Sequence, residues 1–568
     1  MREISKRVMQ KSARYYSITF LLLGSIASTP EIYAINTITT IENKAFLPVF
    51  VAEFSLSSGN KRESLYTYRY LVDQYNSPTI NQRALEVALE LQDTYTALSI
   101  AKTWVDQYPE DVPALFYLAH LSLKAKQFTL ATSTLDKILT IDSNADLEGI
   151  LAGIYPEDDS SRQILLTALQ QISTKDNPSV LVLIAGLEAQ NGQFEAALKK
   201  VNKALKQRPK TPSFIILKAN LYFASEQPDQ ALKWLNQSLK NQDKPDVGLV
   251  EVQYYIKQNR MQDALNRLEV ILKRWPNNEQ LLFLAGITSI DLKRFSSAEH
   301  YLQKLVNSDI YQDQAYYYLA VNAERKQDYS SAIELYKATD GNFYTVSRKG
   351  LVSIYLKQKN STDAIRFLTQ ERISHPHQSS FLYQLQAQLL QELGETKKAI
   401  DLLDEALEQL DDDAELIYAQ VLLLDPFADR TRLDNALNKL LEIEPNSPTF
   451  LNAYAYTLAI QNRNLDVARS YAERAQQLAP KQASILDTLG YVAFLQNDFA
   501  FAVHTLAEAY TLSPSLSIGL RYAKALYVNG EIQKFSILCQ ALLRQYPDSN
   551  EVQQLQFLLT PQTPQQVS

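Results

Sequence analysis

Histidine and cysteine are the side chains of this 568-residue chain that could most readily bind a metal ion or attack a substrate. Two of the five histidines, His375 and His377, flank a proline, but no third ligand lies at a helpful spacing for a metal. His120, His300 and His504 fall within predicted helices, where we interpret them as polar positions. The histidines therefore predict no metal site.

The single cysteine, Cys539, excludes an intramolecular disulfide and a zinc site built on paired cysteines. It falls at a predicted core position of a helix, where burial would raise the pKa of the thiol and leave it inert. The acidic run Asp411–Asp413 lacks the alternating ligands and central glycine of a calcium loop. Asp487 and Asp498 have no catalytic partner in the sequence. Phosphate-loop, zinc-protease and nucleophile-elbow motifs are also missing from the sequence, so we expect no catalytic residue and no cofactor.

Composition favours helices as the elements that carry these residues. Glycine is scarce, at 14 residues, whereas the good helix formers Leu, Ala, Gln and Glu recur throughout. The formal net charge is −7 and basic residues are interspersed with acidic ones, so a phosphate-binding surface is not expected. The chain is also too long for one ordinary core, which favours several domains or a repeat array.

One pattern of small and apolar residues recurs along the chain. In "ILDTLGYVAFLQNDFAFAVHTLAEAYTLSP" it comprises a Leu-Gly pair, then an aromatic residue, small and apolar residues, and a closing proline. The same skeleton occurs in "VLIAGLEAQNGQFEAALKKVNKALKQRP" and in "FLAGITSIDLKRFSSAEHYLQKLV". Apolar residues at intervals of three and four form one face of a helix. The small residues stand where two antiparallel helices approach each other.

The spacing between equivalent residues identifies the repeating unit. Pro480 and Pro514 are 34 residues apart, and so are Ala468 and Ala502. A helix–turn–helix unit of this length is the tetratricopeptide period, and the chain resembles the tetratricopeptide repeat family from about residue 50 to residue 558. The resemblance implies an all-α fold, an α–α superhelix (solenoid) of about 14 helix–turn–helix repeats.

The strength of this pattern varies along the chain and predicts its segments. We expect a signal peptide or uncleaved anchor at 1–34, N-terminal repeats at 43–144, a degenerate repeat at 145–177, a central array at 178–411, a C-terminal array at 412–559, and a disordered tail at 560–568.

The amino terminus has the pattern of an export signal. Basic residues precede the apolar run "ITFLLLGSIA" at 18–27, which is too short to span a bilayer comfortably. Small residues at 27, 28 and 34 mark cleavage points, and an uncleaved anchor stays an alternative. The cysteine that a lipoprotein needs after its cleavage point is missing here, so we expect export without a lipid anchor.

In stacked repeats of this kind, the first helix of each unit lines a concave surface where partners bind. We expect partner contacts from first-helix residues that face this groove: Ile216, Phe223, Phe283, Ile290, Tyr317, Tyr491 and Phe494, with Asp487 beside the last two. The Lys/Asn clamp for a peptide's terminal carboxylate is missing, so the groove would suit an extended chain or an amphipathic helix. Alternatively, tight superhelical winding packs these side chains on one another.

Two blocks carry a closer resemblance. Near the carboxyl end, Asn452 and Tyr456–Ala459 match the pattern "N-x-x-x-Y-T-L-A", and Ile485–Val492 match "I-L-D-(S/T)-L-G-(W/Y)-V". With an N-terminal block that begins "FVAEFSLSSGNKRESLYTYRYL", they resemble the LbcA-type envelope tetratricopeptide proteins of Gram-negative bacteria. The resemblance implies a periplasmic adaptor for a carboxyl-terminal processing protease and its cell-wall hydrolase substrates. The lipid anchor of that group is not matched, and "GLRYAKALYVNG" stands where the group has a His-Leu-Gly-Glu signature.

Three functions therefore compete. The first is a non-catalytic periplasmic scaffold that binds protein partners, such as the protease and its substrates. The second is a scaffold of an envelope assembly or export machine, for exopolysaccharide secretion or pilus biogenesis. The third is an enzyme with an unrecognised site. Nucleic acid is not expected as a partner, because the Tyr-rich runs lack flanking basic residues, and membrane association would come only from an uncleaved N-terminal segment.

Overall fold

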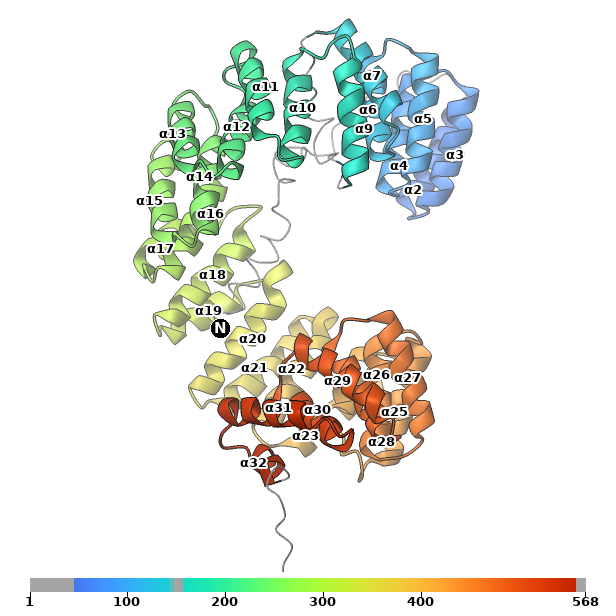
Figure 1. Cartoon of the computed structure of the whole chain (residues 1–568), viewed down its shortest axis with the longest axis vertical. Helices are drawn as coiled ribbons and strands as arrows, with labels where there is room; N and C mark the ends of the chain where they lie inside the picture. Colours follow the sequence, from blue (N-terminus) through green and yellow to red (C-terminus); the bar gives the residue numbers. More distant parts are fainter. Residues whose placement is uncertain (1–44, 144, 146, 148–155, 157, 558–568) are drawn as a thin grey trace, which may run out of the picture. The chain divides into compact units, whose positions relative to one another are not determined.

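The computed structural model describes residues 45–143, 145, 147, 156 and 158–557, and Figure 1 shows the path of the chain. The regular elements of this part are α-helices and two short 3-10 helices. In chain order the elements are α2 (Phe46–Ser57), α3 (Lys61–Gln74), α4 (Pro78–Glu90), α5 (Thr94–Gln107), α6 (Val112–Lys124), α7 (Phe128–Ile141), α9 (Asp159–Gln171), α10 (Pro178–Gln190), α11 (Phe194–Gln207), α12 (Pro212–Ala224), α13 (Pro228–Leu239), α14 (Asp246–Lys257), α15 (Met261–Leu272), α16 (Glu279–Asp291), α17 (Phe295–Gln303), α18 (Gln312–Arg325), α19 (Tyr329–Lys337), η2 (Gly341–Phe343), α20 (Tyr344–Lys357), α21 (Ser361–Ser374), η3 (Pro376–Gln378), α22 (Ser379–Glu392), α23 (Thr396–Gln409), α24 (Ala414–Val421), α25 (Arg430–Ile443), α26 (Pro448–Ile460), α27 (Leu465–Leu478), α28 (Ala483–Leu495), α29 (Phe499–Leu512), α30 (Leu516–Val528), α31 (Ile532–Gln545) and α32 (Asn550–Phe557).

Consecutive α-helices pack as pairs. Three pairs lie between α2 and α7 and eleven between α10 and α31, so the described residues contain fourteen pairs, beside α9 and α32. First helices begin at Pro78 and Val112, and again at Pro178, Pro212 and Asp246, so that neighbours within each set are 34 residues apart. The all-α fold of about 14 helix–turn–helix repeats is confirmed.

Local sequence explains where the helices begin. Proline stands in the first turn of α4, α10, α12 and α26, where its missing N–H leaves no hydrogen bond unmade. Other helices begin after an aspartate whose carboxylate accepts a hydrogen bond from a backbone N–H of the first turn, as Asp93, Asp328 and Asp498 do. Prolines such as Pro209 and Pro480 follow the ends of second helices, as predicted.

In twelve of the fourteen pairs, the turn between the two helices contains one residue with a left-handed backbone; the turn from α26 to α27 contains two, Asn462 and Asn464, and the connection from α24 to α25 contains none. Gly192 and Gly394 have φ values of +74° and +77°, and Lys293 and Asn497 adopt the same region at +58° and +65°. Such a residue ends the first helix and redirects the chain, and glycine adopts this conformation without strain. Gln92, Glu226 and Gln327 adopt it as well, so the turn position accepts several residue types.

Small residues set the distance between the two helices of a pair. A Cβ atom at Gly490 would lie 2.6 Å from Cγ of Leu506, and one at Gly286 would lie 2.6 Å from Cγ of Leu302. Ala502, on the second helix beside Gly490, is fully buried. The cores of these two pairs therefore require the small residues that the repeat pattern predicts.

The chain divides into two compact units, Met1–Tyr311 and Gln312–Ser568. This boundary lies inside the segment 178–411 that the sequence pattern predicts as one central array. Within each unit, consecutive first helices contact one another: α10 with α12 and α12 with α14 in the first unit, and α26 with α28 and α28 with α30 in the second. We call the surface formed by the first helices of one unit its first-helix face.

Several predictions concern residues outside the described ranges. The predicted signal peptide at 1–34 and the predicted tail at 560–568 lie there, as does part of the predicted degenerate repeat at 145–177. Within the described ranges, none of the helices has both the length and the apolar character needed to cross a membrane.

Candidate functional site

All seven residues predicted to contact a partner lie on first helices. Ile216 and Phe223 are on α12, Phe283 and Ile290 on α16, Tyr317 on α18, and Tyr491 and Phe494 on α28. Six of them are half-buried, but Ile290 is only 2% exposed. Ile290 therefore belongs to the core of its helix pair and is not available to a partner.

Several of these aromatic side chains pack on neighbouring rings. Phe223 stacks on Tyr254 of the next first helix, α14, with 4.3 Å between ring centroids and 15° between planes. The ring of Phe283 lies 5.2 Å from that of Tyr311, and the ring of Tyr317 lies 5.0 Å from that of Phe343. The alternative in which these side chains pack on one another thus describes Phe223, Phe283 and Tyr317, which keep only part of their surface for a partner.

The first-helix face of the second unit carries a polar cluster that joins three consecutive first helices. Arg521 on α30 lies between the rings of Tyr456 on α26 and Tyr491 on α28, with its Cζ 5.2 Å and 4.7 Å from their centroids. Its Nη2 donates a hydrogen bond of 3.0 Å to the hydroxyl of Tyr456, and its Nη1 pairs with the carboxylate of Asp487. We call Tyr456, Asp487, Tyr491 and Arg521 the arginine cluster.

The position of Asp487 corrects one expectation. The sequence pattern placed Asp487 beside Tyr491 as a residue presented to a partner, but it is only 8% exposed and pairs with Arg521. Burial raises the pKa of the Asp487 carboxyl, and the guanidinium of Arg521 opposes that rise. The exposed parts of the cluster are therefore the half-buried rings of Tyr456 and Tyr491 and the edge of the guanidinium.

Two buried oxygens on α26 and α28 have no hydrogen-bond partner among the described residues. They are Oδ1 of Asp487 and Oδ1 of Asn452, which stands one helical turn before Tyr456 on α26. Asn452, Tyr456, Asp487 and Tyr491 all belong to the two motifs that carry the closer resemblance. The motifs thus bring polar and aromatic groups together. The sequence did not identify Arg521 as their common partner. The signal that could have identified Arg521 is its separation of 34 residues, one repeat period, from Asp487.

The arginine cluster is suited to binding rather than to catalysis. A guanidinium stacked between two phenol rings can contact a peptide by stacking and by hydrogen bonds. The carboxylate of Asp487 is held by Arg521, and neither a nucleophile nor a second free carboxylate stands beside it among the cluster residues. The site therefore fits a recognition surface.

The His375 and His377 pair lies in a different environment. The two rings are 6.1 Å apart, and Nδ1 of His375 is 3.3 Å from Oε1 of Glu371. Glu371 also accepts hydrogen bonds from Arg348 and Tyr344, so it holds a buried ionic network together. Across the described part of the chain, no group of three His, Cys, Asp or Glu side chains is placed to hold a metal ion.

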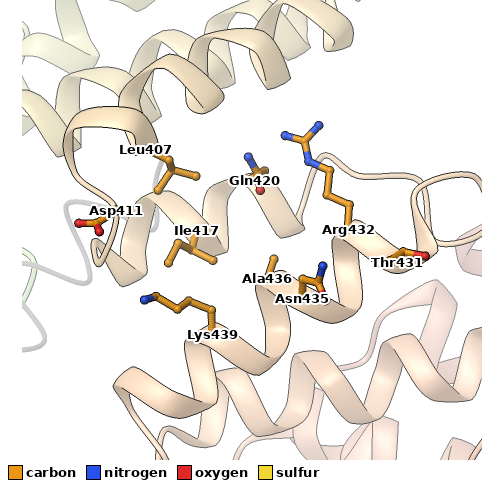
Figure 2. Close-up of a pocket in the computed structure, with 9 residues that line it drawn as sticks. All are labelled: Leu407, Asp411, Ile417, Gln420, Thr431, Arg432, Asn435, Ala436 and Lys439. Carbon is orange, nitrogen blue, oxygen red and sulfur yellow. The ribbon is translucent and has the colours of Figure 1, made fainter.

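Cys539 lies in the core, and Asp411 of the acidic run lines a groove. Cys539 is fully buried on α31, and burial raises the pKa of its thiol to about 11. A shallow groove of about 500 Å³ lies among α23, α24 and α25. Figure 2 shows the side chains that line it: Leu407, Asp411, Ile417, Gln420, Thr431, Arg432, Asn435, Ala436 and Lys439. Two cationic side chains line the groove, and both already form ion pairs: Lys439 with Asp412 at 2.5 Å, and Arg432 with Asp404. Neither cation is therefore left to bind an anionic ligand.

Comparison with known proteins finds similarity to tetratricopeptide repeats over part of the chain. A family model of the tetratricopeptide repeat matches residues 188–250. The TPR repeat-containing protein PA4667 of Pseudomonas aeruginosa is 27% identical over 203 residues, which are 36% of this chain and 34% of that protein. The alignment thus spans about a third of the length of this curated relative.

Solved structures to which the chain shows some similarity include PilW, a type IV pilus biogenesis factor, and the APC/C hetero-tetramer Cut9–Hcn1. PilW is 18% identical, with 39% of this chain and 100% of PilW covered and a TM-score of 0.33. Cut9–Hcn1 is 13% identical, with 87% of this chain and 98% of that chain covered and a TM-score of 0.30.

Proposed function

We propose that this chain is a tetratricopeptide repeat protein and acts as a non-catalytic scaffold of the cell envelope that binds protein partners on its first-helix faces. The observation that carries the proposal is the arginine cluster, in which residues of three consecutive first helices meet on one such face. A surface that spans several repeats suits an extended segment or an amphipathic helix of a partner.

The partner we propose is a carboxyl-terminal processing protease together with its cell-wall hydrolase substrates. Support comes from the two motifs that carry the resemblance to envelope adaptors, because Tyr456, Asp487 and Tyr491 from these motifs all contact Arg521. The rings of Tyr456 and Tyr491 are only half-buried, so the cluster can contact a partner as well as join the repeats. The export pattern at residues 1–34 supports a location in the periplasm or envelope of a Gram-negative bacterium.

The partner can be identified by capture from an envelope extract of the native host. The full chain is immobilised, and proteins that co-elute are identified by mass spectrometry. We expect a processing protease or a cell-wall hydrolase to be enriched. Recovery of polysaccharide-export or pilus components without any protease would overturn the adaptor role and leave a scaffold of another machine.

Two tyrosine variants locate the binding surface. Tyr491→Ala removes a ring of the arginine cluster and should lower capture, whereas Tyr95→Ala removes an 82% exposed ring from the second helix α5 and should not. Thermal unfolding of both variants checks that the repeats stay folded. Equal capture by the two folded variants would place binding away from the cluster.

The location is tested by cell fractionation with an antibody against the chain. We expect the protein in the periplasmic or membrane fraction. Full-length chain confined to the cytoplasm would contradict export.

A further inference from the structure

Helix α2 carries a stripe of large apolar side chains that the rest of the described chain leaves uncovered. The members of this α2 stripe are each between 45% and 70% exposed: Phe46, Leu47, Phe50, Val51 and Phe54. They stand four residues apart in two adjacent rows, so they share one face of the helix. The opposite face, which includes Ala52 and Ser55, is buried against the rest of the unit.

The α2 stripe has no charge within it. The single charged side chain of α2, Glu53, pairs on another side of the helix with groups of α3 and α4. Its carboxylate accepts hydrogen bonds from the hydroxyl of Tyr68 at 2.5 Å and from Nε of Arg83 at 2.7 Å. The helix is therefore apolar on the exposed side as well as on the buried side, which is typical of a helix that is covered on both.

Other first helices pack against a preceding second helix, and among the described residues α2 has no such contact. A preceding second helix packs against each of several first helices, as α3 does against α4, α5 against α6 and α11 against α12. Within the described ranges no helix precedes α2, so no described helix packs against its stripe in this way. End repeats ordinarily have polar outer faces, and a contiguous apolar patch marks an interaction site.

We propose that the α2 stripe is the contact surface of a homodimer, in which α2 of a second copy packs antiparallel against it. An uncharged stripe is self-complementary, because pairing it with itself brings no like charges together. Phe50 lies at the centre of the stripe, so the two-fold axis passes beside it. Phe46 of one copy then contacts Phe54 of the partner subunit.

The exposed area is sufficient for such a dimer. With about 200 Å² for a fully exposed large side chain, the five residues expose on the order of 500 Å² per copy. Two copies would bury on the order of 1,000 Å², which reaches the range of specific interfaces. The three phenylalanines are rigid anchors of the kind that dominate binding energy.

The test is the oligomeric state of the full chain, measured by sedimentation velocity over a concentration series. We expect a concentration-dependent dimer for the natural sequence. Phe50→Glu places two like charges at the two-fold axis and should weaken the dimer by about 30-fold or more. Phe50→Lys should do the same, and an equimolar mixture of the two variants should dimerise again. Ile373→Glu, at a residue that is 71% exposed on α21, is the matched control and should leave the dimer unchanged.

A second measurement tests the register of the pairing. The natural cysteine, Cys539, is fully buried, so an introduced surface cysteine can be oxidised selectively. Phe50→Cys should form a disulfide-linked dimer. Phe46→Cys should not crosslink with itself, but should crosslink with Phe54→Cys in a mixture.

Three results would overturn the proposal. One is a natural chain that stays monomeric at tens of micromolar, as expected if its own residues cover the stripe. Another is a dimer that both Phe50 variants leave intact. The third is a monomer that binds phosphatidylglycerol vesicles through the stripe, which would assign the surface to a lipid bilayer.

Discussion

Asp487 and Arg521 show how a buried ion pair ties consecutive repeats together at the scale of single residues. Both side chains are largely buried, and Arg521 also reaches Tyr456 two first helices away. Sequence reasoning identified Asp487 and Tyr491 but not the contact between Asp487 and Arg521, because the partners are 34 residues apart and meet only when repeats stack. The ring pairs of Phe223 and Phe283 agree with the alternative that the sequence left open, whereas the burial of Ile290 differs from its predicted place in the groove.

Arg521→Ala should destabilise the C-terminal repeats by about 3 kcal/mol, because it leaves the buried carboxylate of Asp487 without its cation. Hydrogen exchange of α28 and α30 measures this local loss, since repeat arrays need not unfold in one step. Adding Asp487→Asn to Arg521→Ala should recover part of the loss, because it removes the unpaired charge. Lys534→Ala breaks an exposed pair with Glu531 and should have no measurable effect. An equal effect of Arg521→Ala and Lys534→Ala would contradict this account.

Cys539 should be protected from thiol reagents in the native protein. Its thiol is fully buried and its pKa is raised to about 11, so both access and the thiolate fraction are low at pH 8. A colorimetric thiol assay should show slow labelling of the native chain and rapid labelling in denaturant. Rapid labelling without denaturant would mean that α31 is open to solvent.

At the scale of elements, the sequence pattern predicted the helix pairs because their signals are local. Capping aspartates, first-turn prolines and left-handed turn residues recur at the ends of the helices. The unit around Pro426 departs from the common pattern, because α24 ends at Val421 and α25 begins only at Arg430. The intervening turn is held by the carboxylate of Asp425, which accepts hydrogen bonds from the backbone N–H groups of Phe427 and Ala428. Residues of α24 and α25, on either side of this turn, line the groove whose side chains Figure 2 shows.

Gly490→Ala tests the close approach of α28 and α29. Helix propensity alone would make alanine more stable by about 1 kcal/mol. The added Cβ would instead lie 2.6 Å from Leu506 and 3.3 Å from its backbone nitrogen, so we expect a net loss of about 1–3 kcal/mol. Urea unfolding of the variant measures the change.

The double variant Gly490→Ala with Leu506→Ala separates crowding from other causes. Once Leu506 is shortened, Gly490→Ala should no longer destabilise the chain, because the crowded side chain is gone. A loss of the same size in both backgrounds would show that close packing against Leu506 is not the reason for the glycine.

At the scale of the whole molecule, two compact units each present a first-helix face, and the arginine cluster lies in the second. The repeat period predicted the fold over most of the chain, because each unit repeats the same local pattern. The division after Tyr311 left no mark in that pattern. A partner that binds along a first-helix face contacts several repeats at once, so it should stabilise the repeats that it spans.

The measurement that tests the central claim most directly is hydrogen exchange of the full chain with and without its captured partner. We predict that bound partner slows exchange in α26, α28 and α30, whose residues form the arginine cluster. The second helices α27 and α29 should change less. Protection confined to the second helices, or exchange that is unchanged while partner is bound, would contradict binding on the first-helix face.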